Sequence, residues 1–163
     1  MVAYRRYYIK GGTWFFTVNL KDRNSRLLTE NIELLRYSVS VIKQRRPFLI
    51  NAWVVLPEHL HCIWTLPNNE YDFSSRWRDI KGCFTHTLKQ NHIWQPRFWE
   101  HAIRGEEDYR RHVDYIHINP LKHGWVTKVI DWPYSTFHRD VQHGLYPLDW
   151  AGDNLDLSCG ERR

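Results

Sequence analysis

The spacing of hydrophobic and polar positions changes several times along the first part of the chain. Between residues 13 and 20, aromatic and β-branched side chains alternate as they do in a strand. From about residue 29 to residue 46 the apolar positions recur every three or four residues, which predicts a helix that the next proline ends. Residues 48–56 are almost continuously apolar, and Pro57-Glu58 then leads into a strand that begins at His59. These last two strands are expected to form an antiparallel hairpin.

The second half repeats the alternation of helix and strand. Helical spacing covers residues 74–90, a strand pattern covers residues 95–104, and a third helix is expected over 106–118. The order strand, helix, strand, strand, helix, strand predicts a ferredoxin-like, split βαβ fold of the α+β class. Such a fold has a four-stranded antiparallel sheet with two helices on one face. The third helix is extra to this pattern, and we expect it to cross the open face of the sheet.

Length and composition narrow the class of protein. The 163 residues fit one domain, which we assign to residues 1–143, followed by a surface tail over residues 144–163. Nine Trp, nine Tyr and seven Phe can fill a core or stack on bases. The net charge of +5 favours an anionic partner, nucleic acid first, although proteins that bind none also carry such an excess.

The cysteine content and the hydropathy of the chain indicate the cellular compartment in which the protein is expected. The three cysteines form no CxxC pair and leave an odd count, which favours a reduced, cytosolic setting. We find no signal-peptide pattern and no apolar run as long as a membrane span, so no membrane partner is expected.

Two histidines on the strand that follows Pro57-Glu58 are the first candidates for chemistry. Side chains alternate between the faces of a strand, so His59 and His61 lie on one face. The apolar residues on the other face would enter the core; these are Leu60, Cys62 and Trp64. Two imidazoles side by side can share one divalent cation. The alternative is a pair of polar side chains on a half-solvated sheet face.

The helix expected over residues 106–118 carries the second set of candidates. Its apolar stripe consists of Tyr109, Val113 and Ile116. Tyr115 is expected about 100° away from this stripe, given the helical period. It shares a face with Arg111 and Asn119, which lie one turn to either side. Either the tyrosine has a chemical role, or it flanks the helix and Asn119 is a C-cap.

Together these residues suggest a phosphodiester-cleaving site. His59, His61 and Asn119 would supply three ligands to a divalent cation, and Tyr115 would be the nucleophile. A free phenol has a pKa near 10, so it needs a nearby cation or base to attack at neutral pH. The cation would also polarise the scissile phosphate. An amide ligand argues against a closed structural zinc site, which uses Cys and His.

Basic side chains spread along the chain are candidates for contacts to a nucleic-acid backbone. Charged residues on a solvated surface are the default interpretation, and a groove for a nucleic-acid backbone is the alternative. The candidates are Arg5, Arg6, Arg78, Lys81, Arg104 and Arg111.

Three segments resemble a known family. Pro57-Glu58-His59-Leu60-His61 resembles the His-hydrophobic-His motif of single-tyrosine transposases. The segment from His112 to Gly124, with Tyr115-x-x-x-Asn119, is similar to the tyrosine helix of the REP-associated tyrosine transposases, where REP denotes a repetitive extragenic palindrome. Residues 95–104 (QPRFWEHAIR) are also similar to that family. The resemblance spans roughly residues 1–140.

This resemblance implies an activity, a partner and a cofactor. The family cleaves and joins single-stranded DNA at a palindrome folded as a hairpin, next to a short guide sequence. Tyr115 would form a 5′-phosphotyrosine and free a 3′-OH, with Mg²⁺ or Mn²⁺ bound by His59 and His61. A bacterial, cytoplasmic and nucleoid-associated location would follow, with a monomer and a dimer both open.

Two other functions fit the same residues. One is a hairpin-binding module with the same fold and little or no catalysis. The other is a metal-dependent phosphodiesterase that attacks with activated water and forms no covalent bond to DNA.

Overall fold

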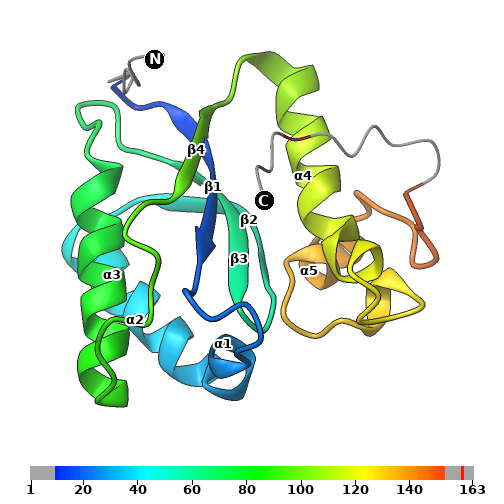
Figure 1. Cartoon of the computed structure of the whole chain (residues 1–163). Coiled ribbons are helices and arrows are strands. Elements are labelled where there is room, and N and C mark those ends of the chain that lie inside the picture. Colours follow the sequence, from blue (N-terminus) through cyan, green and yellow to red (C-terminus); the bar gives the residue numbers. More distant parts are fainter. Residues whose placement is uncertain (1–9, 153–158, 160–163) are drawn as a thin grey trace, which may run out of the picture.

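A four-stranded antiparallel sheet lies at the centre of the molecule (Figure 1). The computed structural model describes residues 10–152 and residue 159. The strands are β1 (Thr13–Asn19), β2 (Leu49–Val55), β3 (His59–Thr65) and β4 (Trp99–Ala102). They are arranged in the order β2-β3-β1-β4, and every neighbouring pair is antiparallel. The predicted ferredoxin-like arrangement is therefore confirmed.

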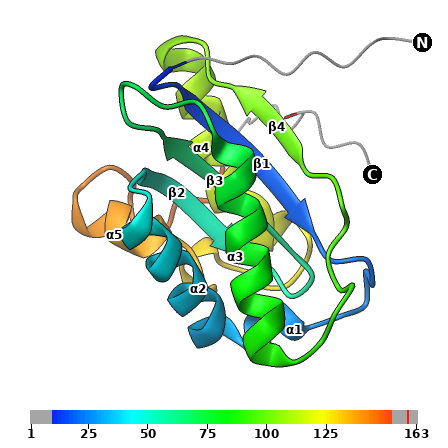
Figure 2. The same ribbon diagram turned by 90° about the vertical axis from the view of Figure 1, so that its left-hand side faces the viewer.

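Helices cover both faces of this sheet. They are α1 (Leu27–Glu30), α2 (Ile32–Arg45), α3 (Phe73–Leu88), α4 (Gly105–Lys122) and α5 (Phe137–Gln142), with a 3₁₀ helix, η1, at Val129–Asp131. Figures 1 and 2 show α2 and α3 on one face and α4 on the other, with α5 beside α4. The third long helix thus crosses the open face, as predicted. Among the described helices, none combines the length and apolar character that a membrane crossing requires.

Two predicted elements have different limits in the structure. The single helix expected over residues 29–46 is two helices, because Asn31 leaves the helical region (φ −118°, ψ 38°). Its side-chain amide donates to the main-chain oxygen of Leu27 at 2.9 Å and so closes α1. The strand expected over residues 95–104 pairs with β1 only from Trp99 to Ala102. Before it, the Gln95 main-chain N–H still donates to Asn19 O at the end of β1, at 2.9 Å, while the Gln95 main-chain oxygen accepts from the Lys81 ammonium group.

The side chains of β3 alternate between the two faces of the sheet, as predicted, and each face carries its own apolar core. Leu60, Cys62 and Trp64 lie in the core beneath α2 and α3, where the Trp64 ring stacks on Trp77 at 4.3 Å. The core beneath α4 contains other residues of the sheet, among them Phe15. The histidines of β3 therefore face α4.

Helix α4 differs from the prediction in length and in its buried face. It continues past Ile118 to Lys122 with Pro120 inside its last turn, which closes because the His123 N–H donates to Asn119 O at 3.0 Å. Tyr115 is only 1% exposed and belongs to the same core as Val113, so the prediction that it lies off the apolar stripe is wrong. The reason is that its ring packs against the sheet, 6.0 Å from that of Phe15 and 5.2 Å from that of His61, so the buried face of α4 is wider than the predicted stripe.

The predicted division at residues 143 and 144 stays a prediction, but part of the tail packs on α4. The Tyr146 hydroxyl donates to the Asp114 carboxylate at 2.5 Å. Its ring also lies 5.0 Å from that of His117.

Arg76 on α3 is fully buried and forms hydrogen bonds to the segment that follows α2 and to the segment that precedes α3. Its guanidinium group donates to the main-chain oxygens of Arg46, Pro47 and Asp72 at 2.8–3.2 Å and to the Glu70 carboxylate. Removing such a donor leaves several acceptors unsatisfied. We expect Arg76→Ala to lower the free energy of unfolding by about 2–4 kcal/mol, measured by urea denaturation.

A matched control lies two residues further along α3. The Arg78 side chain is 77% exposed and lies 3.7 Å from the Asp79 carboxylate. Arg78→Ala should change the free energy of unfolding by less than about 0.5 kcal/mol. Equal losses in the two variants would contradict a structural role for the buried guanidinium.

Candidate metal and nucleophile site

The two histidines of β3 are held close together beneath α4. Their ring centroids are 4.9 Å apart, with the rings nearly perpendicular. His59 is 2% exposed and His61 fully buried, so the alternative of polar residues on a half-solvated face is not what the structure shows.

Each histidine is oriented through its Nδ1 atom. His59 Nδ1 lies 2.5 Å from the Glu58 carboxylate, and His61 Nδ1 lies 2.8 Å from the Thr17 hydroxyl. Thr17 is the cross-strand partner of His61 in β1, so strand register places it there. When Nδ1 donates these bonds, Nε2 carries the lone pair, which is the usual arrangement of a metal-binding histidine with its supporting partner.

Buried polar atoms without partners mark the same region. His59 Nε2 is buried and has no hydrogen-bond partner among the described residues. The same holds for both amide atoms of Asn119, which is 0% exposed and lies one turn after Tyr115 on α4. A buried polar atom normally has a partner, because leaving it unpaired costs free energy. An imidazole nitrogen and an amide oxygen are donors suited to a divalent cation, so these residues fit a bound metal.

Tyr115 lies beside the histidine pair. Its ring centroid is 5.2 Å from that of His61 and 6.0 Å from that of Phe15. Lys122, about two turns further along α4, places its Nζ 3.5 Å from the Tyr115 hydroxyl and 4.8 Å from the ring centroid. The histidine pair, the Tyr115 phenol and the Lys122 ammonium group therefore lie together, in an arrangement suited to attack of the phenol on a phosphate.

Comparison with known proteins identifies the family. The chain is 68% identical over 162 residues to the REP-associated tyrosine transposase of Escherichia coli K12, which covers 99% of this chain and 98% of that protein. The chain belongs to the REP-associated tyrosine transposases. A relative from Haemophilus influenzae that carries the same family name is 42% identical over 171 residues, covering 96% of this chain and 97% of its own. No protein-family model matches the chain.

A solved structure supports the same assignment. The fold matches that of a REP-associated tyrosine transposase bound to a REP hairpin, with a TM-score of 0.94 and 68% identity. The match covers 100% of this chain and 99% of the other.

In this member of the REP-associated tyrosine transposases, the predicted phosphate contacts fall into separate groups. Arg78 and Lys81 line a groove of about 380 Å³ between α3 and the segment before β4, together with the rings of Trp94 and Phe98. Burial lowers the pKa of Lys81 to about 8. Arg104 precedes α4 and Arg111 lies on its exposed side. Arg5 and Arg6 lie outside the described residues.

Sequence reasoning missed several residues that the fold brings to this transposase site. Thr17 and Glu58 orient the histidines, and Lys122 contacts the tyrosine. The His123 ring lies 5.3 Å from that of His59. A signal was present for Lys122, since seven residues are about two helical turns and place it on the face of Tyr115. Thr17 could be found only through the register of β1 and β3.

Proposed function

We propose that this transposase is a metal-dependent enzyme that cleaves and rejoins single-stranded DNA through a covalent bond to Tyr115. One observation carries the proposal. The tyrosine ring lies against a pair of buried histidines whose Nδ1 atoms are both engaged, as they are in metal-binding histidines.

The ligands in this proposal are His59, His61 and Asn119. His59 Nε2 and the Asn119 amide have no partner within the described part of the chain, which supports this set, as does the 4.9 Å separation of the two imidazole rings. When bound, Mg²⁺ or Mn²⁺ would act as a Lewis acid on the scissile phosphate and orient it for in-line attack. Glu58 and Thr17 hold the two rings in place.

The residues of α4 account for the covalent step. The Tyr115 oxygen attacks phosphorus, its proton leaves, and the P–O3′ bond breaks. The product is a 5′-phosphotyrosine, and the departing 3′ oxygen takes up a proton to become a 3′-OH. A cation beside a phenol favours the phenolate, so the Lys122 ammonium at 3.5 Å assists the attack. The reverse reaction joins the 3′-OH of another strand to the same phosphate.

The relative of known structure supports a substrate class. That REP-associated tyrosine transposase is bound to a REP hairpin, and its fold and length match those of this chain. We infer that this chain also binds a single-stranded hairpin formed by a repetitive extragenic palindrome, with a guide sequence beside its foot. The net charge of +5 and the groove lined by Arg78, Lys81 and two aromatic rings suit a DNA backbone and bases.

The test is to incubate the purified chain with an end-labelled single-stranded REP hairpin and Mn²⁺ and to separate the products on a denaturing gel. A labelled band at the mass of the protein, absent without metal, is expected. Cut DNA without such a band would favour activated water as the nucleophile. Bound but uncut DNA would favour a hairpin-binding module without catalysis.

The groove that contains Lys81 gives a pH-dependent prediction. Burial places the pKa of this ammonium group near 8, so it loses its charge as the pH rises from about 7 to about 9. If Lys81 contacts a phosphate, hairpin affinity should fall over this range, by up to about tenfold. Lys81→Arg keeps its charge throughout and should bind with nearly constant affinity. Fluorescence anisotropy at several pH values measures both, and identical pH profiles would contradict the contact.

A further inference from the structure

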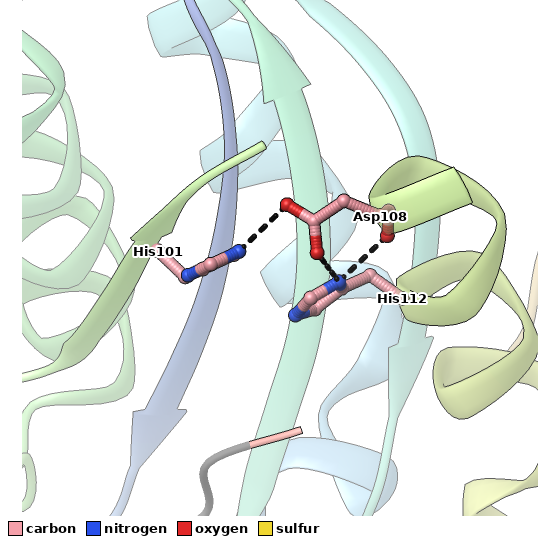
Figure 3. A group of neighbouring side chains, drawn as sticks. All are labelled: His101, Asp108 and His112. Atoms are coloured by element: carbon pink, nitrogen blue, oxygen red, sulfur yellow. Dashed lines mark hydrogen bonds and ion pairs between the residues drawn. The ribbon is translucent and has the colours of Figure 1, made fainter. Parts of the chain in front are cut away.

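A second cluster of potential metal ligands lies at the start of α4. Asp108 and His112 extend from α4, and His101 extends from the edge strand β4 (Figure 3). One ligand atom from each residue lies within 4.8 Å of the other two. Across residues 10–152 and residue 159, no other group of three His, Cys, Asp or Glu side chains meets this closely.

The Asp108 carboxylate is the centre of the cluster. His101 Nε2 lies 2.9 Å from Oδ2, and His112 Nδ1 lies 3.2 Å from Oδ1. The carboxylate also accepts from the Arg104 main-chain N–H at 2.8 Å and from the Arg111 guanidinium at 3.2 Å. Burial opposes ionisation of Asp108, but the N–H of Arg104 and the imidazole of His101 outweigh it and lower the pKa. The group is therefore an oriented, ionised oxygen ligand.

His112 is prepared for a ligand in another way. Its Nδ1 donates to the main-chain oxygen of Asp108 at 2.8 Å, one turn earlier on α4. This bond fixes the tautomer and leaves the lone pair on Nε2, as in metal-binding histidines. Burial lowers the pKa of His112. The imidazole rings of His101 and His112 are stacked, with centroids 4.6 Å apart and planes 14° from parallel.

We propose that His101, Asp108 and His112 form a second metal site, separate from the His59–His61 pair and selective for Zn²⁺ or a similar transition-metal ion. Two imidazoles and a carboxylate are a typical donor set for Zn²⁺, whereas Mg²⁺ prefers oxygen ligands. The His101 side chain is 32% exposed, so an ion can enter from solvent and a water molecule can complete the tetrahedron. On binding, neutral His101 adopts its Nδ1–H tautomer and offers Nε2 to the ion. No oxidation state changes.

Such an ion would fasten the tyrosine-bearing helix to the sheet. His112 and Tyr115 are three residues apart on α4, and Phe15 of β1 contacts both rings, at 4.8 and 6.0 Å. His101 is paired with Phe15 across β1 and β4. The ion would therefore link β4 to α4 directly beside the nucleophile. This inference does not depend on the proposed DNA chemistry.

The test separates the two sites by substitution in the full chain. In the His59→Ala/His61→Ala double variant, equilibrium dialysis should still find one tightly bound Zn²⁺ per chain, and Zn²⁺ should raise its melting temperature. Adding His101→Ala should weaken the Zn²⁺ affinity by about 100-fold or more. An outer-shell substitution alone typically costs about 10- to 100-fold, and losing a ligand should cost at least as much. The Zn²⁺-dependent shift in melting temperature should disappear with it.

Two further variants make the result decisive. Asp108→Asn keeps an acceptor for the Arg104 N–H but removes the negative charge. With His101 intact, this variant should also weaken Zn²⁺ binding. As a control, His86→Ala added to the double variant removes an exposed histidine of α3 and should leave its Zn²⁺ affinity unchanged. No bound Zn²⁺ in the double variant would overturn the proposal. Zn²⁺ binding that survives both His101→Ala and Asp108→Asn would overturn it as well.

Discussion

Tyr115→Phe should abolish the covalent protein–DNA adduct while leaving hairpin binding within about twofold of the original affinity. The substitution removes one oxygen, and the ring keeps its contacts with His61 and Phe15 in the core beneath α4. No other hydroxyl replaces the attacking atom in the proposed reaction. The adduct is measured on a denaturing gel with labelled hairpin and Mn²⁺, and binding by anisotropy.

A matched control distinguishes loss of the nucleophile from loss of a tyrosine on the same helix. Tyr109 is partly buried against the same core, six residues before Tyr115. Tyr109→Phe should form the adduct at close to the unaltered rate. Cleavage that persists in Tyr115→Phe would transfer the attack to water or to another residue, and the assignment of the nucleophile would then be wrong.

The fold could be predicted because its signals are local. A period of two residues identifies the strands, and a period near 3.6 residues identifies the helices. Pro47 predicts a helix end, and α2 ends at Arg45. The placement of His59 and His61 on one face followed from the same geometry, because alternation along a strand allows no other outcome. The interruption at Asn31 was missed, since a side chain that bonds to the preceding turn disturbs no hydrophobic pattern.

The surroundings of the candidate site could be predicted only in part, because they depend on contacts between distant segments. Tyr115 was expected off the core stripe, yet its ring packs against Phe15 and His61 of the sheet and is buried. The partnership of Thr17 with His61 requires the register of β1 and β3, which no local pattern specifies. The cluster around Asp108 requires the turn from β4 into α4 to bring His101 back beside His112.

Substitutions of the proposed metal ligands should separate metal affinity from stability. His59→Ala and Asn119→Leu should each lower Mn²⁺ affinity and adduct yield by more than about 100-fold, since losing a ligand exceeds the effect of losing an outer-shell partner. Isothermal titration with Mn²⁺ measures the affinity. The two variants should nevertheless differ in the free energy of unfolding of the metal-free chain.

The reason lies in what each side chain contacts. His59→Ala leaves a cavity and removes one partner of the Glu58 carboxylate, so stability should fall by about 1–3 kcal/mol. Asn119 instead buries an amide that has no hydrogen-bond partner among the described residues, at a cost of about 1–3 kcal/mol. Leucine has the same branched shape, so Asn119→Leu should raise the stability of the metal-free chain by about 1 kcal/mol. Urea denaturation in EDTA measures both.

The opposite signs are what distinguish a ligand from a structural residue. A side chain kept for packing or internal hydrogen bonds should lose stability when it is replaced, with or without metal. A side chain kept for a metal instead remains unsatisfied until the ion binds, and removing its polar atoms then stabilises the empty site. If Asn119→Leu destabilises the metal-free chain and leaves Mn²⁺ affinity unchanged, Asn119 supports the last turn of α4 and the third ligand must come from elsewhere.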